Sequence, residues 1–248
     1  MDSSRSFRDR LRALDRWLLP PLCAFCQTRL VAAETGLCAP CREDLPANRP
    51  CCPCCAAPLA TDPGNAPCAR CQLRPLPVEA VIAPLRYAFP VDRAIQGLKY
   101  RGRFEFVPVL APLMVEAFQA AALDVDCIVP VPLHWLRHGQ RGFNQAFELA
   151  RPLADAHGLP LVHQVERRRR TRPQSGLGAG PRRANLRGAF SVNGGLDVPH
   201  ALIVDDVMTT GATVIELARC LRRAGVGRVS VLVAARAEAP GQAPALKV

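Results

Sequence analysis

The sequence contains few lysines and few large aromatic side chains. Only Lys99 and Lys247 are lysines, so arginine supplies almost all of the positive charge behind the formal net charge of +11. Together with the abundance of alanine and proline, this usage indicates the compositional bias of a GC-rich genome rather than arginines selected for one site. With 2 Trp and 2 Tyr, the chain also has few of the aromatic side chains on which the bases of single-stranded nucleic acid stack.

Long apolar segments are missing as well. No run of 18 apolar residues occurs, and we therefore expect no transmembrane helix and no membrane insertion. The first 20 residues lack a secretory signal, because arginines and Asp9 and Asp15 interrupt every apolar segment. These absences favour a cytoplasmic protein. Apolar residues at helical spacing predict a short helix over 1–20 that docks on the rest of the chain, with membrane-surface binding as the alternative.

Cysteine, in contrast, is abundant and concentrated. Ten of the 12 cysteines lie between residues 23 and 71, mostly as CxxC units separated by 11 and 12 residues. Two sulfurs three positions apart can bind one metal from a tight turn, and a second such turn completes four ligands. The near-equal gaps predict two tandem zinc ribbons, and a cross-braced pairing of the first unit with the third is the alternative. The expected ligands are Cys23, Cys26, Cys38 and Cys41 in the first ribbon and Cys52, Cys55, Cys68 and Cys71 in the second.

The third CxxC unit can be read in two frames, Cys51/Cys54 or Cys52/Cys55. In a metal-binding turn, backbone N–H groups that follow the first cysteine donate to its sulfur. Pro53 has no N–H, and it stands where the Cys51 frame needs a donor. The sequence therefore favours Cys52/Cys55, with Cys51 and Cys54 as spare thiols that could exchange in.

Zinc is expected to be structural in both ribbons. Residues 21–75 are rich in Pro, Ala and Cys but poor in large apolar side chains, and so short a segment cannot bury enough area to fold alone. Structural zinc contributes about 10–16 kcal/mol in peptides, and four thiolates leave no open coordination position for catalysis. Two such sites lower the net charge to about +7, which still favours acidic partners. Disulfides are the weaker alternative because no export signal is present, and Cys127 and Cys220 are expected in the core.

The remaining part of the chain, residues 76–248, alternates strand and helix patterns. Short apolar strands between helices predict an α/β fold, a parallel sheet with helices on both faces. In such sheets, ligands bind beyond the carboxyl ends of the strands. The expected strands are 79–88, 126–131, 201–204 and 228–234, and the expected helices are 91–100, 107–122, 143–157 and 212–224.

One strand end carries the most informative motif. The apolar run 201–204 is followed by Asp205-Asp206-Val207-Met208-Thr209-Thr210-Gly211-Ala212-Thr213 and then by a helix. A helix N-terminus, hydroxyl donors and a glycine that permits close backbone approach together favour a phosphate. The adjacent carboxylates can accept hydrogen bonds from sugar hydroxyls. The motif therefore predicts a site for a phosphorylated ribose, although an acidic pair and threonines can also serve only as helix caps.

The DDxxTTGxT pattern resembles the motif that binds phosphoribosyl pyrophosphate (PRPP) in type I phosphoribosyltransferases. The upstream segments 129–133, Arg141-Gly142-Phe143-Asn144-Gln145 and 182–190, together with the cysteine ribbons, resemble the ComF family across nearly the whole chain. The resemblance implies a type I phosphoribosyltransferase fold preceded by a double zinc ribbon. It also implies a link to natural competence, DNA uptake or the use of DNA as a nutrient.

The resemblance assigns roles to individual residues. Asp205 and Asp206 would bind the ribose hydroxyls with magnesium nearby, and the 5′-phosphate would lie on Val207 and on the loop Thr209, Thr210, Gly211, Ala212 and Thr213. The pyrophosphate or acceptor side would be formed by Val131, Pro132, Arg141 and Asn144. Arg141 is the candidate that stabilises the leaving group, whereas Asn144 could instead cap its helix. Lys99 fits a site residue and a surface lysine about equally well.

The sequence thus predicts an N-terminal helix over 1–20, a double zinc ribbon over 21–75 and a phosphoribosyltransferase domain over 76–248. The resemblance implies that this domain binds PRPP with Mg²⁺ and transfers the phosphoribosyl group to an acceptor that the sequence does not reveal. The alternatives are a non-catalytic competence protein that binds single-stranded DNA along an arginine-rich stretch that begins at Arg167, and a PRPP sensor without turnover.

Overall fold

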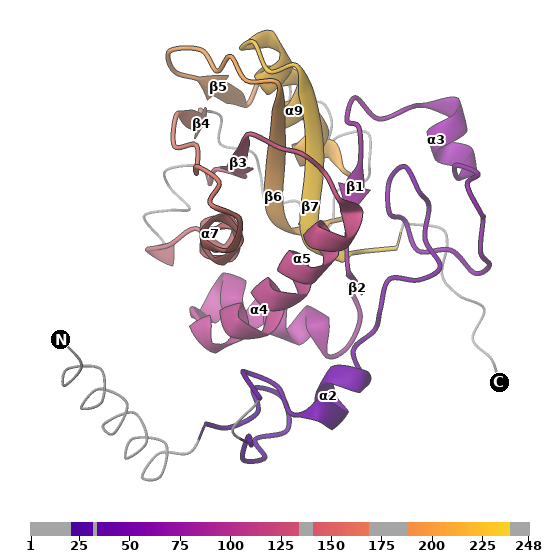
Figure 1. The fold of residues 1–248 in the computed structure, drawn as a ribbon, viewed down its shortest axis with the longest axis vertical. Helices are drawn as coiled ribbons and strands as arrows, with labels where there is room; N and C mark the ends of the chain where they lie inside the picture. Colours follow the sequence, from indigo (N-terminus) through magenta and orange to yellow (C-terminus); the bar gives the residue numbers. More distant parts are fainter. Residues whose placement is uncertain (1–20, 32–33, 134–140, 169–187, 239–248) are drawn as a thin grey trace.

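The structure is a computed structural model that describes residues 21–31, 34–133, 141–168 and 188–238 (Figure 1). The helix expected over 1–20 lies outside these ranges. A five-stranded sheet forms the centre of the molecule. Its two long strands, β6 (His200–Met208) and β7 (Arg228–Arg236), are parallel and pair from His200 opposite Arg228 to Met208 opposite Arg236.

The shorter strands complete the sheet on either side of this pair. β3 (Cys127–Pro130) pairs with β6, and both β1 (Val81–Ile82) and β2 (Leu85–Arg86) pair with β7, all in parallel. The apolar runs of β6 and β7 are buried on both faces, as expected of a parallel sheet covered by helices.

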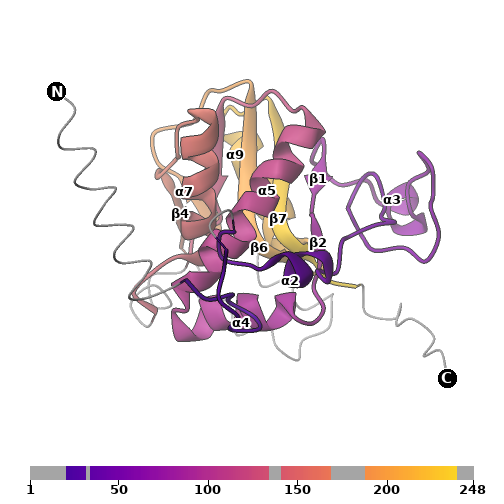
Figure 2. The ribbon, with the colours of Figure 1, turned by 60° about the horizontal axis from the view of Figure 1, so that its bottom comes forward.

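Helices cover both faces of the sheet, as predicted (Figure 2). Alternate residues of β6 enter two separate cores, one shared with α4 (Val91–Arg101), α5 (Val107–Ala121) and α7 (Gln145–His157) and the other with α9 (Ala212–Arg223). A 3-10 turn, Phe104–Phe106, joins α4 to α5. Cys127 and Cys220 are both buried, which confirms their predicted place in the core.

Three features of the sheet differ from the prediction. The strand expected over 79–88 consists of two-residue strands separated at Pro84, which has no N–H to donate to a ladder. The antiparallel pair β4 (Val165–Arg167) and β5 (Phe190–Val192) was not predicted. Strand β6 continues to Met208, so the acidic pair lies inside the strand and not in the turn after it.

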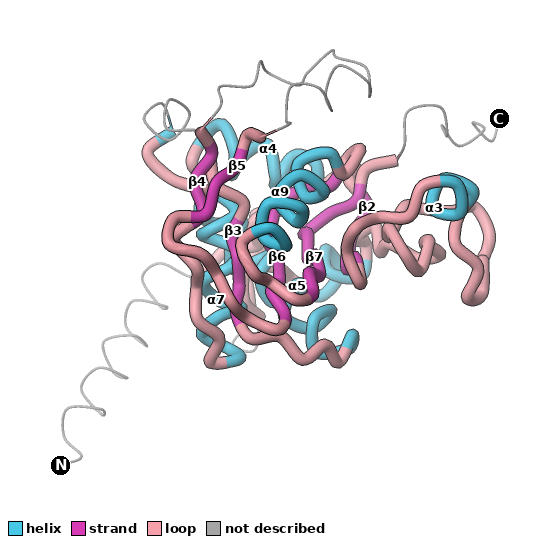
Figure 3. Tube along the Cα trace, turned by 90° about the horizontal axis from the view of Figure 1, so that it is seen from above, coloured by secondary structure: helices cyan, strands magenta, loops and turns pink. Residues whose placement is uncertain are grey.

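The two cysteine ribbons pack in different ways. The first ribbon, with the short helix α2 (Ala39–Glu43), contributes Cys23 and Leu37 to the core beneath α4, α5 and α7. The second ribbon, with α3 (Ala69–Leu73), forms a small cluster of its own around its cysteines. It lies at the β1–β2 side of the sheet (Figure 3).

One described helical stretch, Phe104–Ala121, is long and apolar enough by composition to cross a membrane. In the structure its residues Val109, Leu110 and Met114 are buried in the core that α4, α5 and α7 share. Pro112 lies inside this helix. The stretch therefore serves as a core helix of the α/β unit.

Candidate functional site

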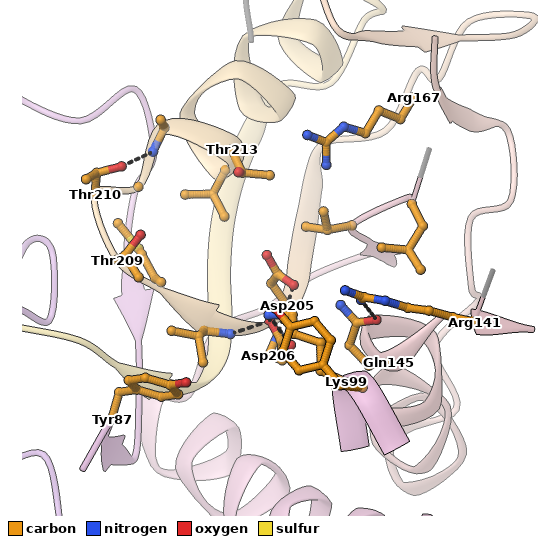
Figure 4. A pocket seen from close by; sticks show the side chains of 18 residues that line it. Tyr87, Lys99, Arg141, Gln145, Arg167, Asp205, Asp206, Thr209, Thr210 and Thr213 are labelled. Carbon is orange, nitrogen blue, oxygen red and sulfur yellow. Dashed lines mark hydrogen bonds and ion pairs between the residues drawn. The ribbon is translucent and has the colours of Figure 1, made fainter. Parts of the chain in front are cut away.

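A cavity of about 510 Å³ opens at the carboxyl ends of β6 and β3 (Figure 4). Its floor and one wall are formed by the motif segment 205–214, which runs from β6 into α9. The other walls come from segments far apart in the sequence, namely Tyr87, Lys99, Tyr100, Val131, Leu133, Arg141, Gln145 and Arg167. The cavity thus lies where parallel-sheet proteins bind their ligands.

The two carboxylates of the motif point to different sides of the sheet. Because successive side chains of a strand alternate between the faces, Asp206 lies on the face covered by α4 and Asp205 on the opposite face. Figure 4 shows Asp205 directed toward Thr213 and Arg167, and Asp206 directed toward Lys99. Asp206 is only 2% exposed, although it lies at the wall of the cavity.

Lys99 is the partner of the buried carboxylate. Its Nζ lies 2.8 Å from Oδ2 and 3.1 Å from Oδ1 of Asp206. Oδ1 also accepts a hydrogen bond from the N–H of Val207 at 2.8 Å. Burial alone would lower the pKa of Lys99, but the charges of Asp206 and Asp205 outweigh it and the pKa is raised. Lys99 and Asp206 therefore form an ion pair at the wall of the cavity.

Asp205 has a different environment. One of its oxygens accepts a hydrogen bond from the N–H of Asp206 at 2.9 Å. Burial and then the neighbouring Asp206 charge raise the pKa of Asp205 to about 8, although Lys99 opposes the shift. A carboxyl group with such a pKa gains from a divalent cation or from hydroxyl donors, because either stabilises its ionised form.

The loop between β6 and α9 has the form of an anion site. Gly211 is the N-cap of α9 with φ of +77°, and a Cβ atom at this position would lie 2.6 Å from Cε of Met208. Thr209, Thr210 and Thr213 line the cavity, and the Thr210 hydroxyl also accepts a hydrogen bond from the N–H of Ala212 at 3.4 Å. Within the described residues, no acceptor contacts the backbone N–H of Thr209, Thr210 or Gly211. These donors remain available to a phosphate.

Basic side chains line the opposite wall. The Arg141 guanidinium lies over the Tyr100 ring at 5.0 Å and donates to Oε1 of Gln145 at 3.2 Å. Arg167, from the unpredicted strand β4, is 8% exposed, lies over the Phe190 ring at 5.6 Å and points into the cavity. Arg167 therefore belongs to the cavity and not to an exposed basic stretch, and positions 169–187 lie outside the described residues.

The cysteines form two clusters outside this cavity. Cys23, Cys26, Cys38 and Cys41 form one and Cys52, Cys55, Cys68 and Cys71 the other, with the sulfurs of each cluster within 4.8 Å of one another. Sulfurs bound to one zinc ion at about 2.3 Å lie about 3.8 Å apart, and the Cys55–Cys68 sulfurs are 3.8 Å apart. The donor set suits structural zinc. The predicted tandem arrangement and the predicted Cys52/Cys55 frame are confirmed, and Cys51 and Cys54 belong to neither cluster.

Known proteins resemble the chain in both parts. The Double zinc ribbon domain family matches residues 14–72, and the Phosphoribosyl transferase domain family matches residues 140–245. DNA utilization protein YhgH of Salmonella typhimurium is 35% identical over 219 residues, which cover 86% of this chain and 96% of that protein. Competence protein F of Haemophilus influenzae is 31% identical over 224 residues, 87% of this chain and 96% of its own. The chain belongs to the ComF family.

A solved structure gives only a remote likeness to this ComF-family protein. The purine phosphoribosyltransferase from Pyrococcus horikoshii matches 68% of this chain and 98% of its own at 16% identity and a TM-score of 0.29. The placement of site residues therefore depends on the chain's own geometry.

That geometry gathers most of the residues predicted for the site but not all. The motif residues, Val131 and Arg141 line the cavity, whereas Pro132 and Asn144 do not. Asn144 is the N-cap of α7, accepts from the N–H of Ala146 at 3.1 Å and donates to the Val131 carbonyl at 3.1 Å. Its alternative as a helix cap is thus the one that the structure supports.

The sequence prediction left Lys99 open between a site residue and a surface lysine. It did not include Tyr87, Tyr100, Gln145 or Arg167, whose polar side chains also line the cavity of this ComF-family protein. For Lys99, Tyr87 and Tyr100, the available signal was the rarity of lysine and tyrosine in this sequence. The cavity contains one of only two lysines and both tyrosines of the chain. For Arg167 no such signal exists, because arginine is common throughout.

Proposed function

We propose that this protein binds PRPP with Mg²⁺ in the cavity and transfers the phosphoribosyl group to an acceptor, in a cytoplasmic pathway of DNA utilisation linked to competence. One observation carries the proposal: the Asp205 carboxylate lines the same cavity as the unpaired N–H groups of Thr209, Thr210 and Gly211. A carboxylate that accepts hydrogen bonds from two sugar hydroxyls, beside a phosphate site, fits a 5-phosphorylated ribose. The name of the Haemophilus relative, Competence protein F, supports the biological setting.

The residues present fit magnesium. Asp205 offers hard carboxylate oxygens of the kind that Mg²⁺ takes while it keeps several waters. A cation there would oppose the burial and the Asp206 charge that raise the pKa of Asp205. Bound magnesium would offset the charge of the pyrophosphate. Asp206 contributes indirectly, because Lys99 already holds both of its oxygens.

The basic wall suits the leaving group. In the transfer, the bond from ribose C1 to pyrophosphate breaks, the acceptor forms the new bond to C1, and pyrophosphate departs with the electron pair. Positive charge builds on the ribose ring and negative charge on the leaving oxygen. Arg141 and Arg167, both lining the cavity, are placed to stabilise the latter.

The proposal is tested by calorimetry of the full chain with PRPP and Mg²⁺, followed by a pyrophosphate-release screen over nucleobases and DNA. We expect magnesium-dependent binding that Asp205→Asn weakens strongly. Binding of equal strength in wild type and in Asp205→Asn would place the ribose elsewhere. Binding without release for any acceptor would favour a PRPP sensor.

A second candidate is a non-catalytic protein that binds single-stranded DNA. It is favoured by exposed aromatic side chains around α4, since Tyr100 is 69% exposed and Phe89 and Phe104 are also exposed. Bases can stack on such side chains. Titration of single-stranded DNA at several salt concentrations, with and without saturating PRPP, separates the candidates. Competition by PRPP would show that DNA and PRPP bind to the same basic side chains. Absence of DNA binding at low salt leaves only the small-molecule function.

A further inference from the structure

A buried arginine connects the second ribbon to residues 208–211, the loop between β6 and α9 that is called the phosphate loop below. Arg236, the last residue of β7, is 1% exposed. Its Nε donates to the carbonyl of Cys55, a member of the second cysteine cluster, at 3.0 Å. Its Nη1 donates to the carbonyls of Met208 at 2.7 Å and Thr209 at 2.5 Å. A buried guanidinium is costly, and here only backbone carbonyls of the described residues are its partners.

A second arginine makes the same kind of contact from within the ribbon. Arg70 precedes Cys71 in α3, and its Nη2 donates to the carbonyl of Thr210 at 2.6 Å. Three consecutive carbonyls of the loop, those of residues 208–210, are thus held by arginines that touch or belong to the second ribbon.

These contacts fix the direction of the neighbouring N–H groups. In a trans peptide the C=O of one residue and the N–H of the next point in opposite directions. Carbonyls held toward Arg70 and Arg236 therefore turn the N–H groups of Thr209, Thr210 and Gly211 away from the ribbon. These are the N–H groups without an acceptor in the described chain. If these peptides rotated, carbonyl oxygens would face the phosphate and repel it.

In the described residues of the first ribbon, no side chain makes a comparable contact with this loop. Arg42 follows Cys41 in α2, so it adjoins the last cysteine of its cluster on the other side from Arg70, and its Nη2 pairs with Glu116 on α5 at 2.5 Å. Neither Arg42 nor Glu116 lines the cavity. The chain thus contains an internal control, two ribbons of similar design of which one reaches the phosphate loop.

We propose that Arg70 and Arg236 are positioning residues through which the metal-bound second ribbon orients the phosphate loop, so that affinity for PRPP depends on the second cluster and not on the first. The proposal rests on the proposed function for its ligand. The arginines act on the loop backbone and do not contact the phosphate themselves.

The first test compares Arg70→Gln with Arg42→Gln in the full chain. Calorimetry with Mg²⁺ and PRPP should show about tenfold weaker binding for Arg70→Gln, since hydrogen bonds of charged groups contribute about 1.5–3 kcal/mol and 1.4 kcal/mol is tenfold. Arg42→Gln should bind as wild type does. Without PRPP, hydrogen exchange should accelerate in Arg70→Gln only, at the loop-end amides of Ala212 and Ile215, which donate to Thr210 and Gly211.

The exchange measurement separates the two proposals. If wild type binds no PRPP but the loop amides still respond to Arg70→Gln, the function is wrong and the coupling stands. If wild type binds PRPP and Arg70→Gln changes neither affinity nor exchange, the coupling is wrong and the function stands.

The second test removes one metal site at a time. Cys71→Ser and Cys41→Ser should each lower the zinc content by one ion per chain, measured by mass spectrometry. We expect PRPP affinity to fall about tenfold or more for Cys71→Ser and less than twofold for Cys41→Ser. Equal losses in the two variants would overturn the assignment of the loop to the second ribbon.

Discussion

Lys99 on α4 and Asp206 on β6 form an ion pair with 2.8 Å between Nζ and Oδ2, across 107 residues of sequence. The carboxylate is buried and the ammonium group is largely covered. The pair joins the end of a helix to the strand that carries the phosphate loop. It therefore contributes to the shape of the cavity as well as to stability.

Removal of the lysine alone should destabilise the protein. Lys99→Met leaves a buried carboxylate without its cation, and we expect a loss of about 1–3 kcal/mol, below the usual cost of breaking a fully buried pair because Lys99 is partly exposed. Lys99→Met combined with Asp206→Asn should recover most of the loss. Urea unfolding of the three variants measures the coupling, and strictly additive effects would contradict the pair.

Asp205→Asn should stabilise the protein while it weakens PRPP binding. In the unfolded chain this carboxyl group ionises near pH ~4, whereas in the folded chain its pKa is raised to about 8. Between these values the folded state binds more protons, so the stability of wild type falls as pH rises. The variant lacks this loss. Its advantage should grow from pH 5 to pH 9 to at least about 1 kcal/mol, or about 2–4 °C in Tm, measured by thermal unfolding without Mg²⁺.

The purified protein should contain two zinc ions per chain. Chelation should unfold both ribbons. The unfolding should spread further from the first ribbon, because its residues Cys23 and Leu37 belong to the core beneath α4, α5 and α7. Hydrogen exchange should therefore spread into α5 on loss of the first metal, while β6 and β7 remain protected. A zinc content near zero after purification under reducing conditions would contradict both clusters.

Arg141 should contribute to the binding of Mg²⁺–PRPP through its charge, in an orientation set by its contact with Tyr100. Arg141→Gln should weaken binding of Mg²⁺–PRPP about tenfold, since on the proposed function it removes one charged partner of the pyrophosphate. Arg101→Gln is the matched control, because Arg101 is exposed on α4 next to Tyr100 but does not line the cavity. Calorimetry with both variants decides the matter, and equal affinities would remove Arg141 from the site.

Periodicity and local chemistry predicted much of this structure. The helices of the sheet region fall within a few residues of their expected bounds because each has an apolar stripe over several turns. The Cys52/Cys55 frame followed from one missing N–H at Pro53. Both are local properties of the chain, and local properties can be read from sequence.

The errors have a common physical origin in distant partners. β4 and β5 are three-residue strands, too short for a periodic signal, and each exists because of the other. The buried Asp206 pairs with Lys99, and the buried Arg167 lies over the ring of Phe190. Strand β6 extends past the acidic pair because β7 is equally long. None of these partners is marked by spacing along the chain.

The alternation of side chains along β6 gives two identical neighbouring residues different chemical environments. Asp205 and Asp206 differ by one position, yet one faces the cavity without a cation and the other is neutralised by Lys99 within the protein. The same change from Asp to Asn should thus raise stability at the first position and lower it at the second. A protein that exchanged the two environments by slipping β6 one residue against β7 would lose its ligand site and its ion pair at once.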